Sequence, residues 1–308
     1  MSLKSLNIPV IDFVGRRKYA MIFSAILLIV SIASIGFQGL KFGIDFTGGT
    51  LIELGYEKTA DLEGIRSKLA SADFKGANVQ YFGSDTEVLI QLEPQSTSSA
   101  KLSSSIIRML GEGIDVRRVE FVGPKVGEEL TNDGGLAMLY ALIGILIYVA
   151  FRFEYRFALG SIVALVHDVI ITLGVFSLLQ IEFDLTVLAA ILAVIGYSLN
   201  DTIVVFDRIR ENFLATRQVE PGSIINEALN QTLSRTLMTS LTTLLVLFAL
   251  FYLGGEVIHS FAGALLIGVV IGTYSSIYVA SSTILAMGIS KEDMLPSEKE
   301  KKEIDARP

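Results

Sequence analysis

The sequence predicts a polytopic α-helical membrane protein that carries one small α+β domain. Three observations lead to this prediction. The chain of 308 residues is 51% hydrophobic, with a mean hydropathy of +0.57, which is too apolar for a soluble domain of this size. Six apolar runs are long enough to cross a bilayer, which takes about 17–25 helical residues. One long polar segment separates the first run from the other five.

The six membrane spans are expected at residues 20–37, 131–151, 157–179, 185–207, 233–253 and 262–287. The first span follows Arg16, Arg17 and Lys18, so it could also be a secretory signal peptide. Its apolar run is longer than a usual signal core, which favours an uncleaved anchor. The other five spans are expected to form one bundle over residues 131–288.

The remaining segments follow from these positions. Residues 1–19 form an N-terminal segment. Residues 208–232 form a loop between spans four and five that contains an amphipathic helix on the membrane surface. Residues 289–308 form a tail rich in Lys and Glu, which is expected to be disordered.

The charges of the loops predict the orientation of the chain. Segments that contain Lys and Arg alternate along the bundle with the short loops at 180–184 and 254–260, which contain neither. Short loops that carry Lys and Arg stay in the cytoplasm. Both termini are therefore expected to be cytoplasmic, and residues 38–130 are expected to be exported.

The exported segment is expected to fold as a small domain with the element order βαββαβ, which is that of the ferredoxin-like split βαβ fold. The expected strands lie at residues 50–56, 77–83, 86–93 and 116–123, and the expected helices at 59–72 and 97–113. The Ser-rich part of the second helix could instead be a linker. The segment contains no Ser/His/Asp set, phosphate loop or cluster of metal ligands, which favours a binding or mechanical task over catalysis.

The stretch KFGIDFTGGT (41–50) leads from the first span into this domain and predicts a structured turn. Gly48 and Gly49 permit backbone conformations that other residues resist. Gly43 comes shortly before Asp45, whose carboxylate can accept hydrogen bonds from nearby amides.

Three stretches together resemble a known family: this turn motif, VGPKVGEEL (122–130) and IGYSLNDTIVVFDRIREN (195–212). They are similar to the SecD/SecF family of bacterial protein-export membrane proteins, and the resemblance covers nearly the whole chain. The single short exported domain and the motif of the fourth span resemble the SecF branch rather than SecD. Six such spans also look like one half of an RND-type transporter, so a second half is expected.

The resemblance implies an accessory subunit of the Sec preprotein translocase in the bacterial inner membrane, and not an enzyme. Such a subunit acts with SecD and uses the proton motive force to drive or complete protein export. The implied partners are SecD, the SecYEG translocon, YajC, YidC, an unfolded preprotein in transit and membrane lipid, with no nucleic acid.

The fourth span contains a carboxylate, Asp201, before its apolar pattern ends. A charge at the centre of a bilayer costs about 2.5–3.5 kcal/mol on insertion scales, and an Asp side chain avoids this cost by binding a proton. At about 100° per residue, Tyr197 and Asp201 flank a narrow face that is expected to pack closely against other helices. The members of that face are Ala189, Ala193, Gly196 and Asn200.

Other polar residues are candidates for the same proton path. Arg235 and Thr239 lie on a polar stripe near the start of the fifth span, at a depth similar to that of Asp201, so an ion pair between Asp201 and Arg235 is expected. His167 and Asp168 lie near the middle of the third span, where they either extend the path or form a static hydrogen-bonded pair.

The coupling ion is expected to be H⁺, with Asp201 as the protonation site, although Na⁺ could bind the same carboxylate. No other cofactor, catalytic residue or metal ligand is expected. The chain has no Cys and only two His, which excludes thiolate metal sites and argues against a His-based zinc site.

Several alternatives stay open. Asp201 could merely bridge helices, and Arg235 could extend to the cytoplasmic surface. A proton-coupled RND-type exporter of small amphiphiles would have a similar bundle, but residues 38–130 are few for a drug-conducting headpiece. Two intramembrane Asp residues also suggest a protease, yet the chain contains no Gly-x-Gly-Asp sequence.

Overall fold

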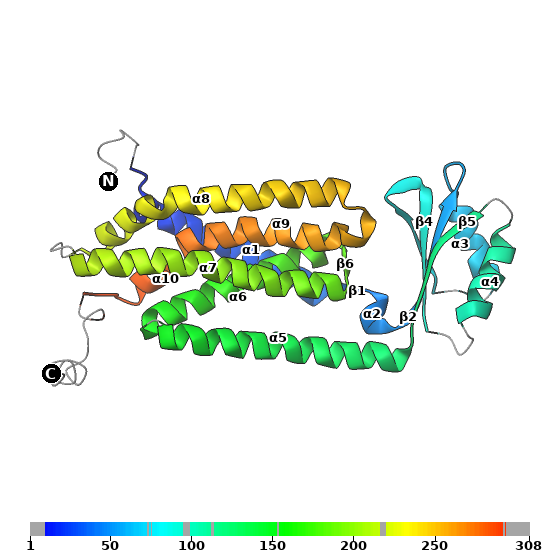
Figure 1. The fold of residues 1–308 in the computed structure, drawn as a ribbon, viewed down its shortest axis with the longest axis horizontal. Coiled ribbons are helices and arrows are strands. Elements are labelled where there is room, and N and C mark those ends of the chain that lie inside the picture. The colour runs from blue at the N-terminus through cyan, green and yellow to red at the C-terminus, as the bar shows by residue number, and fades with distance from the viewer. Residues whose placement is uncertain are drawn as a thin grey trace, which may run out of the picture.

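The computed structural model describes residues 10–72, 74, 76–94, 99–111, 114–152, 154–215, 220–291 and 293. It consists of a bundle of long helices and a small α+β domain beyond one end of the bundle (Figure 1). We call this end the domain end. The start of α1 and the end of α10 lie at the opposite end, which we call the terminal end.

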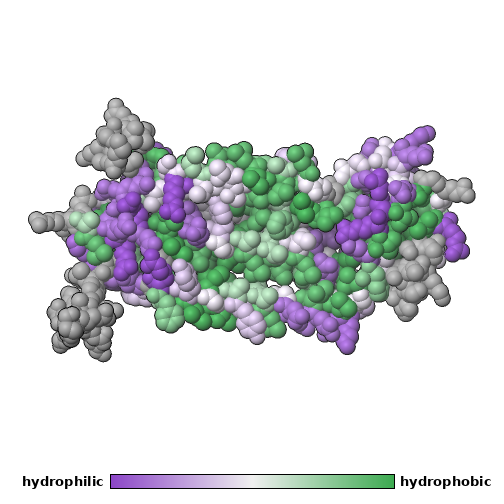
Figure 2. Space-filling model, viewed as in Figure 1, coloured by the Kyte–Doolittle hydropathy of each residue, from purple (hydrophilic) through white to green (hydrophobic). Residues whose placement is uncertain are grey.

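Six helices are long and apolar enough to cross a membrane. They are α1 (Phe13–Gln38), α5 (Pro124–Arg152), α6 (Tyr155–Leu179), α7 (Leu185–Ala215), α8 (Pro221–Leu253) and a last helix, His259–Ala286, which joins α9 (His259–Ser275), a π-helical turn (Ser276–Ala280) and α10 (Ser281–Ala286). Apolar side chains cover the middle of the bundle, and hydrophilic side chains gather at its terminal end and on the small domain (Figure 2). This is the architecture of a polytopic helical membrane protein.

Both α1 and α5 begin earlier than their apolar runs. α1 begins at Phe13 rather than at residue 20, because Asp12 caps it by accepting a hydrogen bond from the Gly15 amide at 2.7 Å. α5 begins at Pro124 rather than at residue 131, and proline is favoured in the first turn of a helix. Apolar runs mark the part of a helix that lies in the membrane, whereas capping residues mark its ends.

The segment 208–232, expected to connect spans four and five and to contain an amphipathic helix, is mostly helical. α7 continues to Ala215, α8 begins at Pro221, and residues 216–219 lie outside the described part of the chain. The expected amphipathic helix is the first part of α8, whose apolar side chains are buried against the bundle: Ile224, Ile225, Ala228 and Leu229. Of the tail expected to be disordered, only residues 289–291 and 293 are described.

The small domain has a four-stranded antiparallel sheet and two helices. Its elements follow in the order β2 (Gly49–Tyr56), α3 (Leu62–Ser71), β3 (Asn78–Phe82), β4 (Ser84–Leu92), α4 (Ser99–Leu110) and β5 (Ile114–Val122). The strands lie side by side in the order β3-β4-β2-β5. α3 and α4 cover one face of the sheet, and Ile52, Leu69, Ile90 and Ile106 form a buried core there.

Two short segments, which we call the connector, join the bundle to this domain: Lys41–Gly49 and Glu182–Leu185. Within them, β1 (Lys41–Phe42) pairs in parallel with β6 (Glu182–Phe183), and α2 (Ile44–Thr47) is a single helical turn. Gly48 and Gly49 end this turn with φ angles of 70° and 137°. A Cβ atom on Gly49 would overlap the carbonyl oxygen of Leu92 at the end of β4.

The first prediction concerns this close approach. Gly49→Ala is expected to lower the free energy of unfolding by about 1–3 kcal/mol, because alanine is strained at this φ angle and has no room beside Leu92. The measurement is thermal unfolding of the purified protein in detergent. Gly36→Ala in α1 is the matched control, because nothing lies within 4 Å of a Cβ there. Equal unfolding temperatures for the two variants would contradict the prediction.

The second prediction concerns Glu182, which lies in the connector. Burial raises the pKa of Glu182 above its ordinary value of 4.5; nearby Lys41 lowers this pKa, and Asp184 and Asp45 raise it. The folded protein therefore holds this proton more tightly than the unfolded chain does. The resulting stability is fully present below the ordinary pKa and is lost as the pH rises through the raised pKa.

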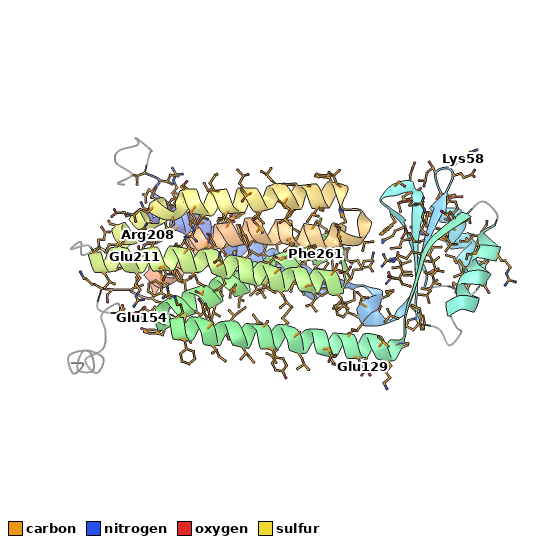
Figure 3. The ribbon with its side chains drawn as sticks, in the orientation of Figure 1. Lys58, Glu129, Glu154, Arg208, Glu211 and Phe261 are labelled. Atoms are coloured by element: carbon orange, nitrogen blue, oxygen red, sulfur yellow. The ribbon has the colours of Figure 1, made fainter. Side chains whose placement is uncertain are left out.

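Glu182→Gln is therefore expected to make unfolding less dependent on pH and to stabilise the protein at neutral pH. Unfolding temperatures between about pH 4 and pH 8 test this expectation. Glu129→Gln in α5 is the control, because Glu129 points away from the molecule (Figure 3). A parallel pH profile for wild type and Glu182→Gln would count against the prediction.

Candidate functional site

Asp201 lies inside the bundle, where two hydroxyl groups hold it. The residue is only 8% exposed. Thr236 of α8 donates a hydrogen bond to Oδ1 at 2.7 Å, and Ser276 of the π-helical turn donates one to Oδ2. Asp201 itself belongs to α7, so its carboxylate joins three helices that all contribute to one bundle core.

The close packing of α7 against α9 explains why Asp201 points inward. A Cβ atom on Gly268 of α9 would overlap Val194 of α7, and one on Gly272 would lie 3.0 Å from the Cβ atom of Ser198. The two glycines therefore let the helix axes approach. One turn further along, the same faces bring the Ser276 hydroxyl to Asp201.

The expected packing face of α7 does not pack against another helix of this chain. Its members are all exposed: Ala189, Ala193, Gly196 and Asn200. Nothing lies within 4 Å of a Cβ atom at Gly196. Where α7 packs against α9, the glycines that permit the approach belong to α9, and the small-residue face of α7 is open. Tyr197, at the border of this face, is half-buried and donates to the Ser240 hydroxyl at 3.2 Å.

The expected ion pair between Asp201 and Arg235 is also wrong for the described part of the chain. Arg235 is exposed, and its charge acts on Asp201 through space without a direct bond. The reason is helical geometry, because Thr236 faces Asp201 and its neighbour Arg235 is turned about 100° away. Thr239 is exposed as well and donates to the carbonyl oxygens of its own helix, at Arg235 and Thr236.

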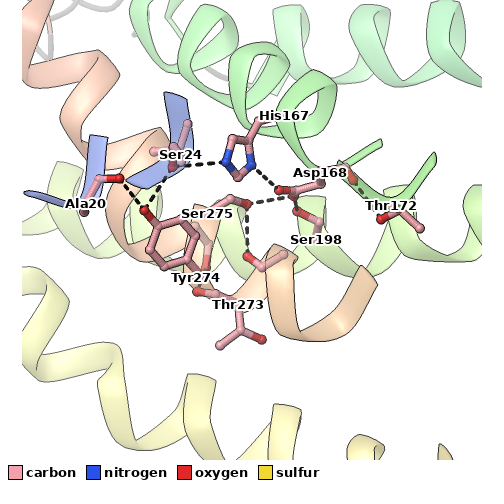
Figure 4. A network of polar contacts seen from close by, with 12 residues as sticks. Ala20, Ser24, His167, Asp168, Thr172, Ser198, Thr273, Tyr274 and Ser275 are labelled. Carbon is pink, nitrogen blue, oxygen red and sulfur yellow. Dashed lines mark hydrogen bonds and ion pairs between the residues drawn. The ribbon is translucent and has the colours of Figure 1, made fainter. Parts of the chain in front are cut away.

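Asp168 of α6 is the centre of a second buried polar cluster (Figure 4). It is 1% exposed, and three side chains hold its carboxylate. Its Oδ2 accepts hydrogen bonds from Ser198 of α7 at 2.5 Å and from Ser275 of α9 at 2.7 Å, and its Oδ1 lies 2.9 Å from Nδ1 of His167. His167 and Asp168 therefore do form a hydrogen-bonded pair.

This cluster continues toward α1. Nε2 of His167 lies 3.1 Å from the hydroxyl of Ser24, and that hydroxyl lies 2.9 Å from the hydroxyl of Tyr274. Tyr274 donates to the carbonyl oxygen of Ala20 at 2.7 Å. A continuous chain of polar groups thus runs from Asp168 to α1 (Figure 4).

Four consecutive residues of α9 and its π-helical turn, Thr273–Ser276, reach four different helices. Thr273 is hydrogen-bonded to Ser240 of α8 at 2.6 Å, and Tyr274 binds α1. Ser275 donates to Asp168 of α6, and Ser276 donates to Asp201 of α7. The π-helical turn begins at Ser276, and such turns occur frequently at functional sites. The two carboxylates are therefore held by adjacent serines.

Sequence reasoning missed the hydroxyl partners of both carboxylates. The missed residues are Ser24, Ser198, Thr236, Tyr274, Ser275 and Ser276. The available signal was the run TYSS (273–276), four polar residues inside an apolar span. No group of three or more His, Cys, Asp or Glu side chains that could hold a metal ion occurs among the described residues.

Comparison with protein families matches most of the chain. Residues 103–290 match the family described as "Protein export membrane protein SecD/SecF, C-terminal", and residues 33–60 match the "SecD/SecF GG Motif". The chain belongs to the SecD/SecF family. The resemblance of its three sequence motifs is thereby confirmed.

Relatives within the family carry the name "Protein translocase subunit SecF". The chain is 55% identical over 305 residues to that of Vibrio alginolyticus, covering 97% of each chain. It is 47% identical over 302 residues to that of Escherichia coli O157:H7, covering 96% of this chain and 94% of the other.

A solved structure, that of SecDF, "a translocon-associated membrane protein", from Thermus thermophilus, has a similar fold. The TM-score is 0.84 at 40% identity, covering 93% of this chain. This chain spans 39% of the length of the SecDF chain.

The third prediction concerns the Asp168 cluster. Asp168→Ala removes the acceptor of two buried serine hydroxyls and should lower the free energy of unfolding by at least about 2 kcal/mol. Asp168→Asn keeps one oxygen acceptor and should cost less. Thermal unfolding in detergent distinguishes the two, with Val166→Ala on the exposed side of the same helix as control. An Asp168→Ala protein as stable as the control would mean that the cluster does not hold the bundle.

Proposed function

We propose that this chain is the SecF-type subunit of a bacterial Sec protein translocase, and that with SecD it uses the proton motive force to drive or complete preprotein export. The observation that carries the proposal is a buried carboxylate, Asp201, in a chain that is 55% identical to a protein translocase subunit SecF over 97% of its length. Proton binding at Asp201 is the step that this chain contributes.

The partners of Asp201 suit proton uptake. The ionised carboxylate only accepts hydrogen bonds, whereas the protonated acid also donates one. On protonation, the hydroxyl of Thr236 or of Ser276 can accept a hydrogen bond from the acid and donate its own elsewhere. An acceptor is ready for Ser276, because its hydroxyl lies 3.1 Å from the carbonyl oxygen of Thr273. Proton binding would thus change the bond that ties α7 to the π-helical turn.

Asp168 and His167 extend this proposal, because Ser275 and Ser276 are adjacent and each holds one carboxylate. A shift of the π-helical turn on protonation of Asp201 would also move Ser275 and change its hydrogen bond to Asp168. Arg235 contributes its charge at longer range and is available to a partner.

The proposed location is the bacterial inner membrane, with both termini in the cytoplasm. Support comes from basic residues at the helix ends of the terminal end: Arg16, Arg17, Lys18, Arg152, Arg156, Arg208 and Arg210. Arg208 and Glu154 are seen at this end in Figure 3. Because basic loops stay in the cytoplasm, the small domain would lie on the exported side.

SecD is the proposed partner at the open face of α7. A polar amide such as Asn200 lacks hydrogen-bond partners when it faces lipid, and Gly196 leaves room for a second helix. The neighbouring helix α8 also exposes Arg235 and Thr239. A partner helix seated there would cover these groups and bring its own polar side chains near Asp201.

The small domain is proposed to be a ferredoxin-like domain that acts on the preprotein. Its element order and its strand order β3-β4-β2-β5 support this class. The SecYEG translocon, YajC and YidC are proposed partners by family membership alone. An RND-type exporter of small amphiphiles is not favoured, because the relatives named above are translocase subunits.

The fourth prediction tests Asp201. Asp201→Asn keeps the shape of the side chain but cannot exchange a proton, so preprotein translocation driven by a proton gradient after ATP removal should be lost in inverted membrane vesicles. Glu211→Gln, at the exposed end of the same helix, is the control and should behave as wild type.

Assembly with SecD must be normal in both variants for this comparison. Gradient-driven completion at the normal rate in Asp201→Asn would overturn the proposed role of this residue. A gradient of Na⁺ alone, applied to wild-type vesicles, tests the coupling ion, because H⁺ coupling predicts no completion under that condition.

A further inference from the structure

The GG motif, residues 33–60, includes the first segment of the connector. The proposed proton binding at Asp201 does not by itself explain what this segment does. Its position is notable because three parts of the molecule meet there. The segment Lys41–Gly49 follows α1, precedes β2 without a linker, and touches the start of α7, the helix that contains Asp201.

The contact with α7 is a charged cap. The amide of Leu185, the first residue of α7, donates a hydrogen bond to Oδ2 of Asp45 at 3.0 Å. Amides in the first turn of a helix have no partner within the helix, and a negative charge there interacts favourably with the helix dipole. Asp184 caps another amide of the first turn, that of Val187, at 2.8 Å. Asp45 thus supplies from outside what α7 lacks in its own first turn.

Backbone pairing and aromatic rings reinforce this contact. The amide of Gly43 donates to the carbonyl oxygen of Phe183 at 2.9 Å, next to the pairing of β1 with β6. The rings of Phe42, Phe46 and Phe183 form a closed set, with centroid distances of 5.8, 6.0 and 5.8 Å. The start of α7 is therefore fixed to α2 by a side chain, a backbone bond and three packed rings.

The other side of α2 is fixed just as closely to the small domain and to α5. A Cβ atom on Gly48 would lie 3.1 Å from Cα of Pro124, and one on Gly127 would lie 2.9 Å from the nitrogen of Gly48. Gly49 begins β2 against the end of β4. α2 is in close contact with α7 on one side and with α5 and the small domain on the other. A displacement of α7 is therefore expected to displace the small domain.

We propose that the GG motif is the mechanical joint through which α7 moves the small domain, with Asp45 as the positioning residue that fixes the first turn of α7 to it. The proposal rests on the proposed function of Asp201. Asp201 lies sixteen positions after Leu185 in α7, which is about 24 Å of continuous helix. A stiff helix of this length transmits an axial shift from the protonation site to the joint.

The fifth prediction is that Asp45 couples Asp201 to the position of the small domain. Because the chain contains no Cys, spin labels can be attached to cysteines introduced at Lys58 in the small domain and Tyr19 in α1, both exposed. Electron-spin distance measurements on the full chain with SecD in lipid nanodiscs should show a shift of the Lys58–Tyr19 distance in Asp201→Asn. Asp45→Ala should abolish this shift, and Asp45→Asn, which still accepts the Leu185 bond, should retain it.

The possible outcomes separate the two proposals. A shift that survives Asp45→Ala overturns the joint and leaves the role of Asp201 intact. If the Lys58–Tyr19 distance does not change in Asp201→Asn with Asp45 present, the proposed motion of the small domain is overturned, and the joint with it. This holds whether or not Asp201→Asn stops export. If Asp45→Ala only loosened the fold, it would lower the unfolding temperature without removing the response to Asp201→Asn. Export by Asp45→Ala should fall about fivefold or more, the lower end of typical coupling between sites.

A cross-link provides an independent test. Phe42 and Phe183 are register partners of β1 and β6, so cysteines at both positions are close enough to form a disulfide. If β1 and β6 stay paired throughout the cycle, the oxidised Phe42→Cys/Phe183→Cys protein should support export as well as its reduced form. Loss of export on oxidation, recovered on reduction, would mean that this pairing opens during the cycle and would overturn a rigid joint.

Discussion

A carboxylate inside an apolar helix bundle needs hydrogen-bond donors, and this requirement organises the core of the molecule. Asp168 and Asp201 lie on different helices, and adjacent serines at the start of the π-helical turn hold them. For both serines to reach their carboxylates, α9 must lie close to α6 and α7, and the glycines at 268 and 272 permit the approach to α7. The hydrogen bonds to the two carboxylates and the close packing of the helices thus depend on the same short stretch of α9.

Neutral donors leave the carboxylates free to change state. An ion pair with Arg235 would have fixed the charge of Asp201, since removing one partner of a buried pair is strongly destabilising. Hydroxyl groups can donate or accept, so they remain satisfied whichever form the acid takes. The exposed Arg235 and the open face around Gly196 leave room for a partner chain beside Asp201, as proposed above.

The sequence predicts some features well for physical reasons and others poorly. Long apolar runs identify the helices of the bundle, and strand alternation identifies the order of the small domain, because both depend on local periodicity. The partners of Asp201 could not be predicted, because hydroxyls in helices often bond to their own backbone. Thr242 does so with Met238, whereas Ser276 reaches across to α7. Only the packing of α9 decides between these choices, and it also decides which face of α7 stays open.

The arrangement of residues 273–276 also restricts how the chain length can vary. Each of these four side chains serves a different neighbouring helix, and successive residues are about 100° apart around the axis. Inserting or deleting one residue shortly before Thr273 would turn all four toward the wrong neighbours at once. This stretch is therefore far less tolerant of a change in length than of a change in any one side chain, and homologous chains should align through it without gaps.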